Sequence, residues 1–102
     1  MKALIGAVAF AGMVIAGGAQ AQEKLAQASG CLTCHSVDKK IVGPAYKDVA
    51  AKYRKDKSAE AKLVAKVKNG GKGVWGDVPM PPNPQVKDAD IKSLVHWILS
   101  LK

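Results

Sequence analysis

Two cysteines and a histidine stand close together in the stretch Cys31-Leu32-Thr33-Cys34-His35. Two thiols separated by two residues can add across the two vinyl groups of one haem, and a histidine that follows at once can lie on the iron axis. This order of residues is the c-type haem attachment pattern. The sequence therefore predicts covalent haem attachment through Cys31 and Cys34, with His35 as one axial ligand of the iron.

Other chemistries also use a Cys-x-x-Cys pair, notably zinc sites and thiol–disulfide exchange. A structural zinc needs four ligands, usually in two separated pairs, whereas the only other Cys or His residue of the chain is His96. A thioredoxin-like protein would place the motif near a βαβ pattern, and no run of β-branched residues predicts a strand. A disulfide across so short a loop would stabilise little. Haem attachment is therefore the favoured interpretation.

The N-terminal stretch has the pattern of a secretory signal peptide. Lys2 supplies a positive start, residues 3–16 are uncharged and apolar, and residues 19–21 form an Ala-Gln-Ala cleavage site. The apolar run is shorter than the roughly 20 residues that a membrane-spanning helix needs. We therefore expect residues 1–21 to be removed on export to the periplasm. The mature domain, residues 22–102, would have no stable membrane insertion.

This mature domain is small and basic. At such a size the hydrophobic core alone is marginal, and a buried haem would help to hold the fold together. Loss of Lys2 leaves 15 of the 16 basic residues against 8 acidic ones, a net charge of +7. Nucleic acid is the first partner to consider for a basic chain, but no nucleic-acid motif is present and the export signal argues against it. We therefore expect acidic protein partners.

Apolar periodicity predicts three or four helices and no sheet. Residues 23–30 form a short helical candidate that ends at Gly30. A second helix is expected over residues 46–53, where apolar side chains recur at i, i+3, i+4 and i+7. A third helix would begin after Ser58 as N-cap, bury Leu63, Val64 and Val67, and end at Asn69-Gly70-Gly71.

The last helix has the clearest periodicity. It is expected to begin near Asp88, and its apolar residues are Ile91, Leu94, Val95, Ile98 and Leu99. The preceding stretch, residues 72–87, is expected to form a loop, because its prolines exclude a helix or a paired strand.

Met80 is the strongest candidate for the second axial ligand of the iron. Met1 and Met13 would leave with the signal peptide, so Met80 is the only thioether of the mature chain. The prolines around it fix the backbone and reduce the entropy lost in presenting the sulfur. His96 lies away from the apolar face of the last helix and is expected to face solvent. His/Met is an established axial pair.

Several motifs, in this order and spacing, resemble the small bacterial class I cytochromes c of the c-551/c-552 type. The motifs are Cys31-Leu32-Thr33-Cys34-His35, Val42-Gly43-Pro44-Ala45-Tyr46, Gly73-Val74-Trp75-Gly76, Pro79-Met80-Pro81-Pro82-Asn83 and Trp97-Ile98-Leu99-Ser100. The resemblance covers essentially the whole mature chain. It implies an all-α, single-domain fold of three to four short helices wrapped around one covalently bound haem c.

The resemblance also implies roles for three further residues. Pro44 would accept a hydrogen bond from His35 through its carbonyl, Trp75 would donate its indole N–H to a haem propionate, and Asn83 would hydrogen-bond near the ligating sulfur. The first and last helices would cross near Gly30 and Trp97. Lys87 departs from the family pattern, since it stands where a capping Thr or Ser is usual, and this leaves the start of the last helix open.

The predicted function is that of a soluble, monomeric, periplasmic one-electron carrier, and not that of an enzyme. Its partners would be acidic redox proteins, namely a reductase and a terminal oxidase or nitrite reductase. We expect Lys39, Lys40, Lys72 and Lys87 to supply positive charge at the haem rim. The alternative is a haem enzyme or gas sensor with an open sixth coordination position, which a ligating Met80 would exclude.

Overall fold

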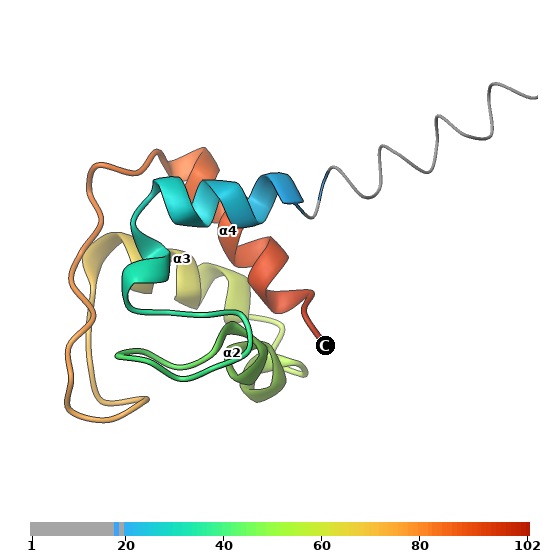
Figure 1. Ribbon diagram of the computed structural model, residues 1–102. Coiled ribbons are helices and arrows are strands. Elements are labelled where there is room, and N and C mark those ends of the chain that lie inside the picture. The colour runs from blue at the N-terminus through green and yellow to red at the C-terminus, as the bar shows by residue number, and fades with distance from the viewer. Residues whose placement is uncertain (1–17, 19) are drawn as a thin grey trace, which may run out of the picture.

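The computed structural model describes Gly18 and residues 20–102, so the predicted signal peptide lies almost entirely outside the described residues (Figure 1). Residues 20–28 are helical, and the further elements are η2 (Cys31–Thr33), α2 (Tyr46–Tyr53), α3 (Ala59–Asn69) and α4 (Asp88–Leu99). Within the described part of the chain the only β pairing is two isolated bridges. The prediction of an all-α fold with three or four helices is confirmed.

The first helix ends where the haem motif begins. Gly30 has a φ of 82°, a left-handed conformation that glycine adopts without steric cost, and the single turn of η2 follows at once. The first helix and α4 meet where Gln22, Ser93 and Trp97 line one slot. At Gly30 itself a Cβ would meet nothing within 4 Å.

Helix α2 buries the face that the periodicity predicts. Tyr46, Val49 and Ala50 are buried, and α2 packs against α4. The neighbouring helix α3 differs from expectation, because its only buried residue is Ala59. Leu63 and Val67 are half-buried, since they line a pocket rather than a closed core.

The N-cap prediction for α3 is also wrong in its mechanism. Ser58 precedes the helix, but its side chain makes no capping hydrogen bond. Asp56 acts instead, because its carboxylate accepts hydrogen bonds from the Ser58 backbone N–H at 2.9 Å and from the Ser58 hydroxyl at 2.6 Å. A carboxylate near a helix N-terminus is also favoured by the helix dipole.

Helix α4 is the centre of the core, in contact with both α2 and α3. Ile91, Leu94, Val95 and Ile98 are buried, as the periodicity predicts. The helix starts at Asp88 with Lys87 as an N-cap that contributes no side-chain hydrogen bond. An ion pair of 2.8 Å between Lys68 Nζ and Asp88 ties this uncapped end to the end of α3.

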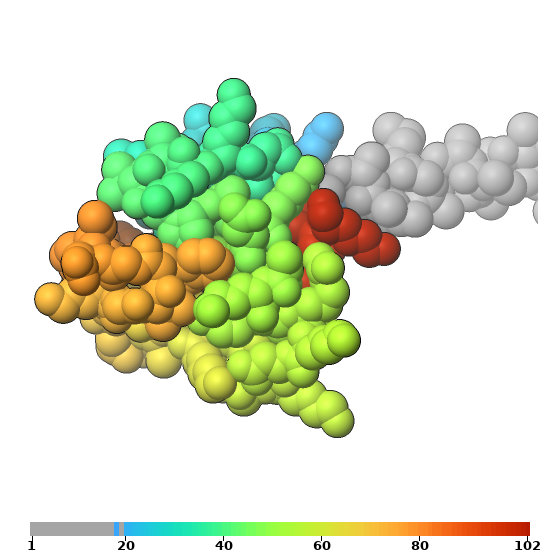
Figure 2. Space-filling model, turned by 90° about the horizontal axis from the view of Figure 1, so that it is seen from below, coloured from blue at the N-terminus to red at the C-terminus, as the bar shows by residue number. Residues whose placement is uncertain are grey.

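Two irregular segments complete the fold, residues 34–45 and residues 70–87. On the face shown in Figure 2, the orange segment around residue 80 borders the green segment around residue 40. Residues of both segments line one pocket. None of the helices described is long and apolar enough to cross a membrane.

Candidate functional site

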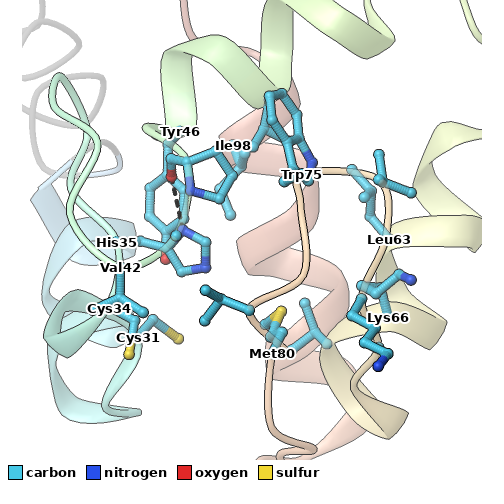
Figure 3. A pocket seen from close by; sticks show the side chains of 18 of the residues that line it. Cys31, Cys34, His35, Val42, Tyr46, Leu63, Lys66, Trp75, Met80 and Ile98 are labelled. Carbon is cyan, nitrogen blue, oxygen red and sulfur yellow. Dashed lines mark hydrogen bonds between the residues drawn. The ribbon is translucent and has the colours of Figure 1, made fainter.

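A pocket of about 310 Å³ lies between the two irregular segments and the helices. Cys31, Cys34, His35 and Met80 all line it (Figure 3). Most of the remaining wall is apolar, with side chains from all three long helices, among them Val49, Leu63, Val67, Leu94, Val95 and Ile98. Residues far apart in the sequence are thus brought to one apolar space that is lined by two thiols, an imidazole and a thioether.

The orientation of His35 is fixed on three sides. Its Nδ1–H donates a hydrogen bond of 2.8 Å to the Pro44 carbonyl oxygen, as the resemblance implies. The Tyr46 ring stacks on the imidazole, with centroids 5.1 Å apart and planes inclined by 25°. Gly43 passes so close that a Cβ there would lie 2.5 Å from His35 Cε1. With Nδ1 engaged, Nε2 keeps the free lone pair that metal ligation requires.

The Cys31 thiol lies half-buried beside Tyr46. Burial raises the pKa of this thiol, and a hydrogen bond with the Tyr46 side chain offsets part of the rise. Burial also raises the pKa of the Tyr46 hydroxyl, and the neighbouring Cys31 adds to the rise. The site therefore favours the neutral form of both groups.

Hydrogen bonds on both sides of Met80 hold its segment. The Met80 backbone N–H donates to the Gly71 carbonyl at 2.8 Å, and the Gly71 N–H donates to the Met80 carbonyl at 3.0 Å. Asn83 Nδ2 donates to the Val67 carbonyl at 3.0 Å and to the Pro81 carbonyl at 3.2 Å. The Asn83 amide thus fastens the loop next to Met80 to the end of α3. Its expected hydrogen bond near the Met80 sulfur stays a prediction.

His96 does not reach the pocket. Its side chain is exposed on α4, where it lines the slot between the first helix and α4 together with Gln22 and Trp97. The expectation that His96 faces solvent is therefore confirmed. Met80 is the candidate that the fold brings into the same pocket as His35.

The positive charge around the pocket is only partly where it was expected. Lys40 and Lys72 line the pocket, but Lys39 and Lys87 do not. Lys66 lines it as well, although it was not among the lysines expected there. The side chain of Lys66 packs closely against Gly71. A Cβ on Gly71 would lie 2.6 Å from the Lys66 Nζ.

The contacts of two residues near the pocket, Tyr46 and Lys52, were not predicted from the sequence. Tyr46 was expected only as an apolar position of a helix, yet it contacts His35 and Cys31. Its place two residues after Pro44 was the available signal. Lys52 lies over the Trp75 ring, with its Nζ 5.6 Å from the centroid, and nothing in the local sequence indicates this contact.

Comparison with known proteins agrees with this arrangement. Residues 19–102 match the family model described as Cytochrome c. The chain is 63% identical to cytochrome c-551 of Allochromatium vinosum, over 92% of this chain and 100% of that protein. It is 50% identical to cytochrome c-552 of Nitrosomonas europaea, over 98% of this chain and 97% of that protein.

The chain belongs to the cytochrome c family. A crystal structure of wild-type Nitrosomonas europaea cytochrome c552 superposes with a TM-score of 0.76 at 52% identity. The match covers 78% of this chain and 99% of that one. The cytochrome c fold and the c-551/c-552 type are thereby confirmed, and the chain is a small monohaem electron-carrier cytochrome.

The residues of the pocket fit the haem c that this family carries. The two thiols lie on one wall, where they can form the two thioether bonds, and the apolar lining suits a macrocycle. The close approach of Gly43 leaves the His35 ring no room to turn away. The family assignment thus decides between haem, zinc and thiol exchange in favour of covalently attached haem c.

Proposed function

We propose that the protein is an exported, soluble one-electron carrier whose haem is bound through Cys31 and Cys34 and ligated by His35 and Met80. The observation that carries this proposal is the meeting of an oriented imidazole and a fastened thioether in one pocket. Haem iron takes up and releases one electron between its ferric and ferrous states. The chain's part is to hold both ligands, exclude water and leave no open position.

Each further residue has a role in this proposal. The Pro44 carbonyl raises the basicity of His35 and keeps Nε2 directed at the iron. The Asn83 amide holds the segment that presents the Met80 sulfur, and Trp75 offers its indole N–H to a haem carboxylate. A thioether is a soft, neutral ligand, and an apolar pocket disfavours the extra charge of the ferric state, so the reduction potential should be positive.

Export and partners complete the proposal. Cleavage after Ala21 would release residues 22–102 into the periplasm as a monomer. The net charge of +7 after loss of Lys2 supports acidic redox partners, a reductase on one side and an oxidase or nitrite reductase on the other. The protein would pass electrons between them without acting on a substrate.

The ligand assignment is tested with two variants of the purified holoprotein. Met80→Ala should abolish the weak far-red absorption band that arises from sulfur-to-iron charge transfer, and should let carbon monoxide bind the ferrous form. His96→Ala removes the other candidate ligand from an exposed position and should leave the spectrum unchanged. Loss of the native spectrum in His96→Ala alone would reverse the assignment.

An open-iron enzyme or gas sensor makes the opposite prediction. In that case the wild-type ferrous protein would bind carbon monoxide readily, and Met80→Ala would change little. Covalent attachment is tested separately, by acid–acetone extraction of the denatured protein. Haem bound through Cys31 and Cys34 stays with the polypeptide, whereas haem found in the organic phase would contradict attachment.

A further inference from the structure

The contact between Lys52 and Trp75 joins two walls of the haem pocket. Lys52 stands in the last turn of α2, the helix whose first residue, Tyr46, stacks on His35. Trp75 belongs to the segment that leads to Met80. The Lys52 Nζ lies 5.6 Å from the centroid of the Trp75 ring, within the range of a cation–π interaction. The pair therefore links the wall on the His35 side to the wall on the Met80 side.

Neither group of this pair is satisfied by an acidic or carbonyl partner within the described residues. The ion pairs found there involve Lys47, Lys62 and Lys68, and none involves Lys52. The Trp75 indole N–H donates to no acceptor among the same residues, and the Trp75 side chain is 43% exposed. Trp75 lines the pocket, whereas Lys52 does not line it but places its ammonium over the Trp75 ring. The common chemical complement of an N–H donor and a neighbouring ammonium is a carboxylate.

We propose that Lys52 is a positioning residue for the haem, which holds Trp75 by its ring face and supplies the positive charge for a haem carboxylate at this edge. The inference rests on the proposed haem carrier function and adds a residue to it. The in-plane indole N–H stays free to donate, because the ammonium occupies the face of the ring. Trp75 is then the donor to the carboxylate, and Lys52 provides both the clamp and the counter-charge.

Two measurable consequences follow from this placement. A fixed positive charge near the haem favours the ferrous state, which carries one positive charge less than the ferric state, so Lys52 raises the reduction potential. The clamp also limits opening of the Trp75 segment. A cation–π contact at an exposed site is worth about 0.5–1 kcal/mol, which corresponds to roughly a two- to five-fold change in an opening equilibrium.

The test compares Lys52→Gln with Lys55→Gln in the holoprotein. Both variants remove one positive charge from an exposed lysine, but Lys55 lies beyond the end of α2 and does not contact Trp75. Lys52→Gln should lower the reduction potential by clearly more than Lys55→Gln does. It should also speed hydrogen exchange of the Trp75 indole N–H, followed by NMR, by about two- to five-fold. Lys52→Arg keeps the charge and the stacking and should restore both values.

The inference would be overturned if Lys52→Gln and Lys55→Gln shifted the reduction potential equally and had equal exchange rates. It would also be overturned if Lys52→Arg behaved like Lys52→Gln. The absorption spectrum of each variant separates this outcome from failure of the proposed function. If the His/Met spectrum is kept in all variants, equal shifts count against the role of Lys52 alone. If the wild-type protein lacks covalent His/Met haem, the proposed function fails and this inference fails with it.

Discussion

Tyr46 contacts two residues of the Cys31–His35 motif. Its ring stacks on the His35 imidazole, and its hydroxyl lies beside the Cys31 sulfur. It also meets Trp97 edge to face, with ring centroids 5.8 Å apart. Aromatic pairs of these geometries stabilise a fold by roughly 0.5–1.5 kcal/mol beyond the area that they bury. A single buried ring therefore connects His35 to the packing of α4.

Burial of Tyr46 predicts a loss of stability at alkaline pH. Its folded pKa is raised above the ordinary value of 10.0, chiefly by burial, so the folded state keeps a proton that the unfolded state releases. The contribution of Tyr46 to stability is thus complete below pH 10 and is lost as the pH rises above it. Tyr46→Phe should flatten this decline in the holoprotein, measured by denaturant unfolding between pH 8 and pH 11.

Tyr53→Phe is the matched control, because Tyr53 stands on the same helix and also lines the pocket. It should leave the alkaline decline of the wild type in place. If Tyr46→Phe and the wild type lose stability in parallel above pH 10, the hydroxyl of Tyr46 is not the group responsible.

At the scale of the elements, the connection between α2 and α3 is held by one carboxylate. Asp56 accepts hydrogen bonds from Ser58, and its second oxygen pairs with Lys62 Nζ at 3.0 Å, one turn into α3. These contacts lower the pKa of Asp56 from 3.8 to about 2, with the Ser58 side chain as the largest cause. Asp56 thus fixes the start of the helix that carries Val67 and Lys66 to the pocket.

The lowered pKa makes an acid-dependent prediction for Asp56→Asn. The carboxylate of Asp56 adds stability above pH 3.8, and this contribution is lost as the pH falls through about 2. The variant should therefore be less stable than the wild type at pH 6, and the difference should shrink near pH 2. Thermal unfolding of both proteins at the two pH values measures this difference in stability. Asp77→Asn, which removes an exposed charge from the loop, should lack this pH dependence. A similar pattern in Asp77→Asn would rule out the Asp56 contacts as its cause.

Helix positions were predictable from the sequence because they depend on local periodicity. Ile91 and its i+3 and i+4 neighbours predicted the buried face of α4, and Gly30 predicted the end of the first helix. The capping by Asp56 was not predictable in the same way, because Ser58 has the better N-cap position and only the turn geometry decides between them. The half-burial of Leu63 also escaped prediction, since periodicity does not distinguish a core face from a pocket wall.

The site was predictable as far as its residues stand in motifs. Cys31, Cys34 and His35 form one local pattern, and Met80 was indicated by being the lone thioether of the mature chain. Lys52 could not be assigned, because its contact with Trp75 arises from how α2 and the Met80 segment meet in space.

At the scale of the whole molecule, positive charge and exposed apolar surface meet at the pocket. Lys40 and Lys72 line it, beside exposed apolar residues that belong to the same two segments. These are Val42, Val74 and Val78, of which Val78 is the most exposed at 65%. Charged groups around an apolar contact area steer a partner during encounter, whereas the apolar area adds contact once the partner has arrived.

Steering of this kind predicts opposite salt effects for oppositely charged redox reagents. Oxidation of the ferrous protein by anionic ferricyanide should slow as salt rises, by about tenfold between low and physiological ionic strength, because charge is screened over roughly 8 Å there. Oxidation by a cationic cobalt complex should speed up. Stopped-flow measurement over a range of salt concentrations gives both rates.

Charge-reversal variants test which lysines steer the redox reagent to the pocket. Lys40→Glu with Lys72→Glu should flatten the salt dependence with ferricyanide more than Lys55→Glu with Lys57→Glu, since the latter pair is exposed but does not line the pocket. Equal flattening by the two pairs would mean that the net charge of the molecule, rather than its placement at the pocket, governs the encounter.

The paired hydrogen bonds between Gly71 and Met80 have a kinetic consequence. A side chain whose backbone is fastened on both sides cannot diffuse away when its bond to a metal breaks. Its return is an intramolecular event, with an effective concentration of about millimolar or more. With Met80 as the proposed ligand, a small external ligand present at micromolar concentration would therefore lose the competition with its sulfur, even when each binds equally well once in place.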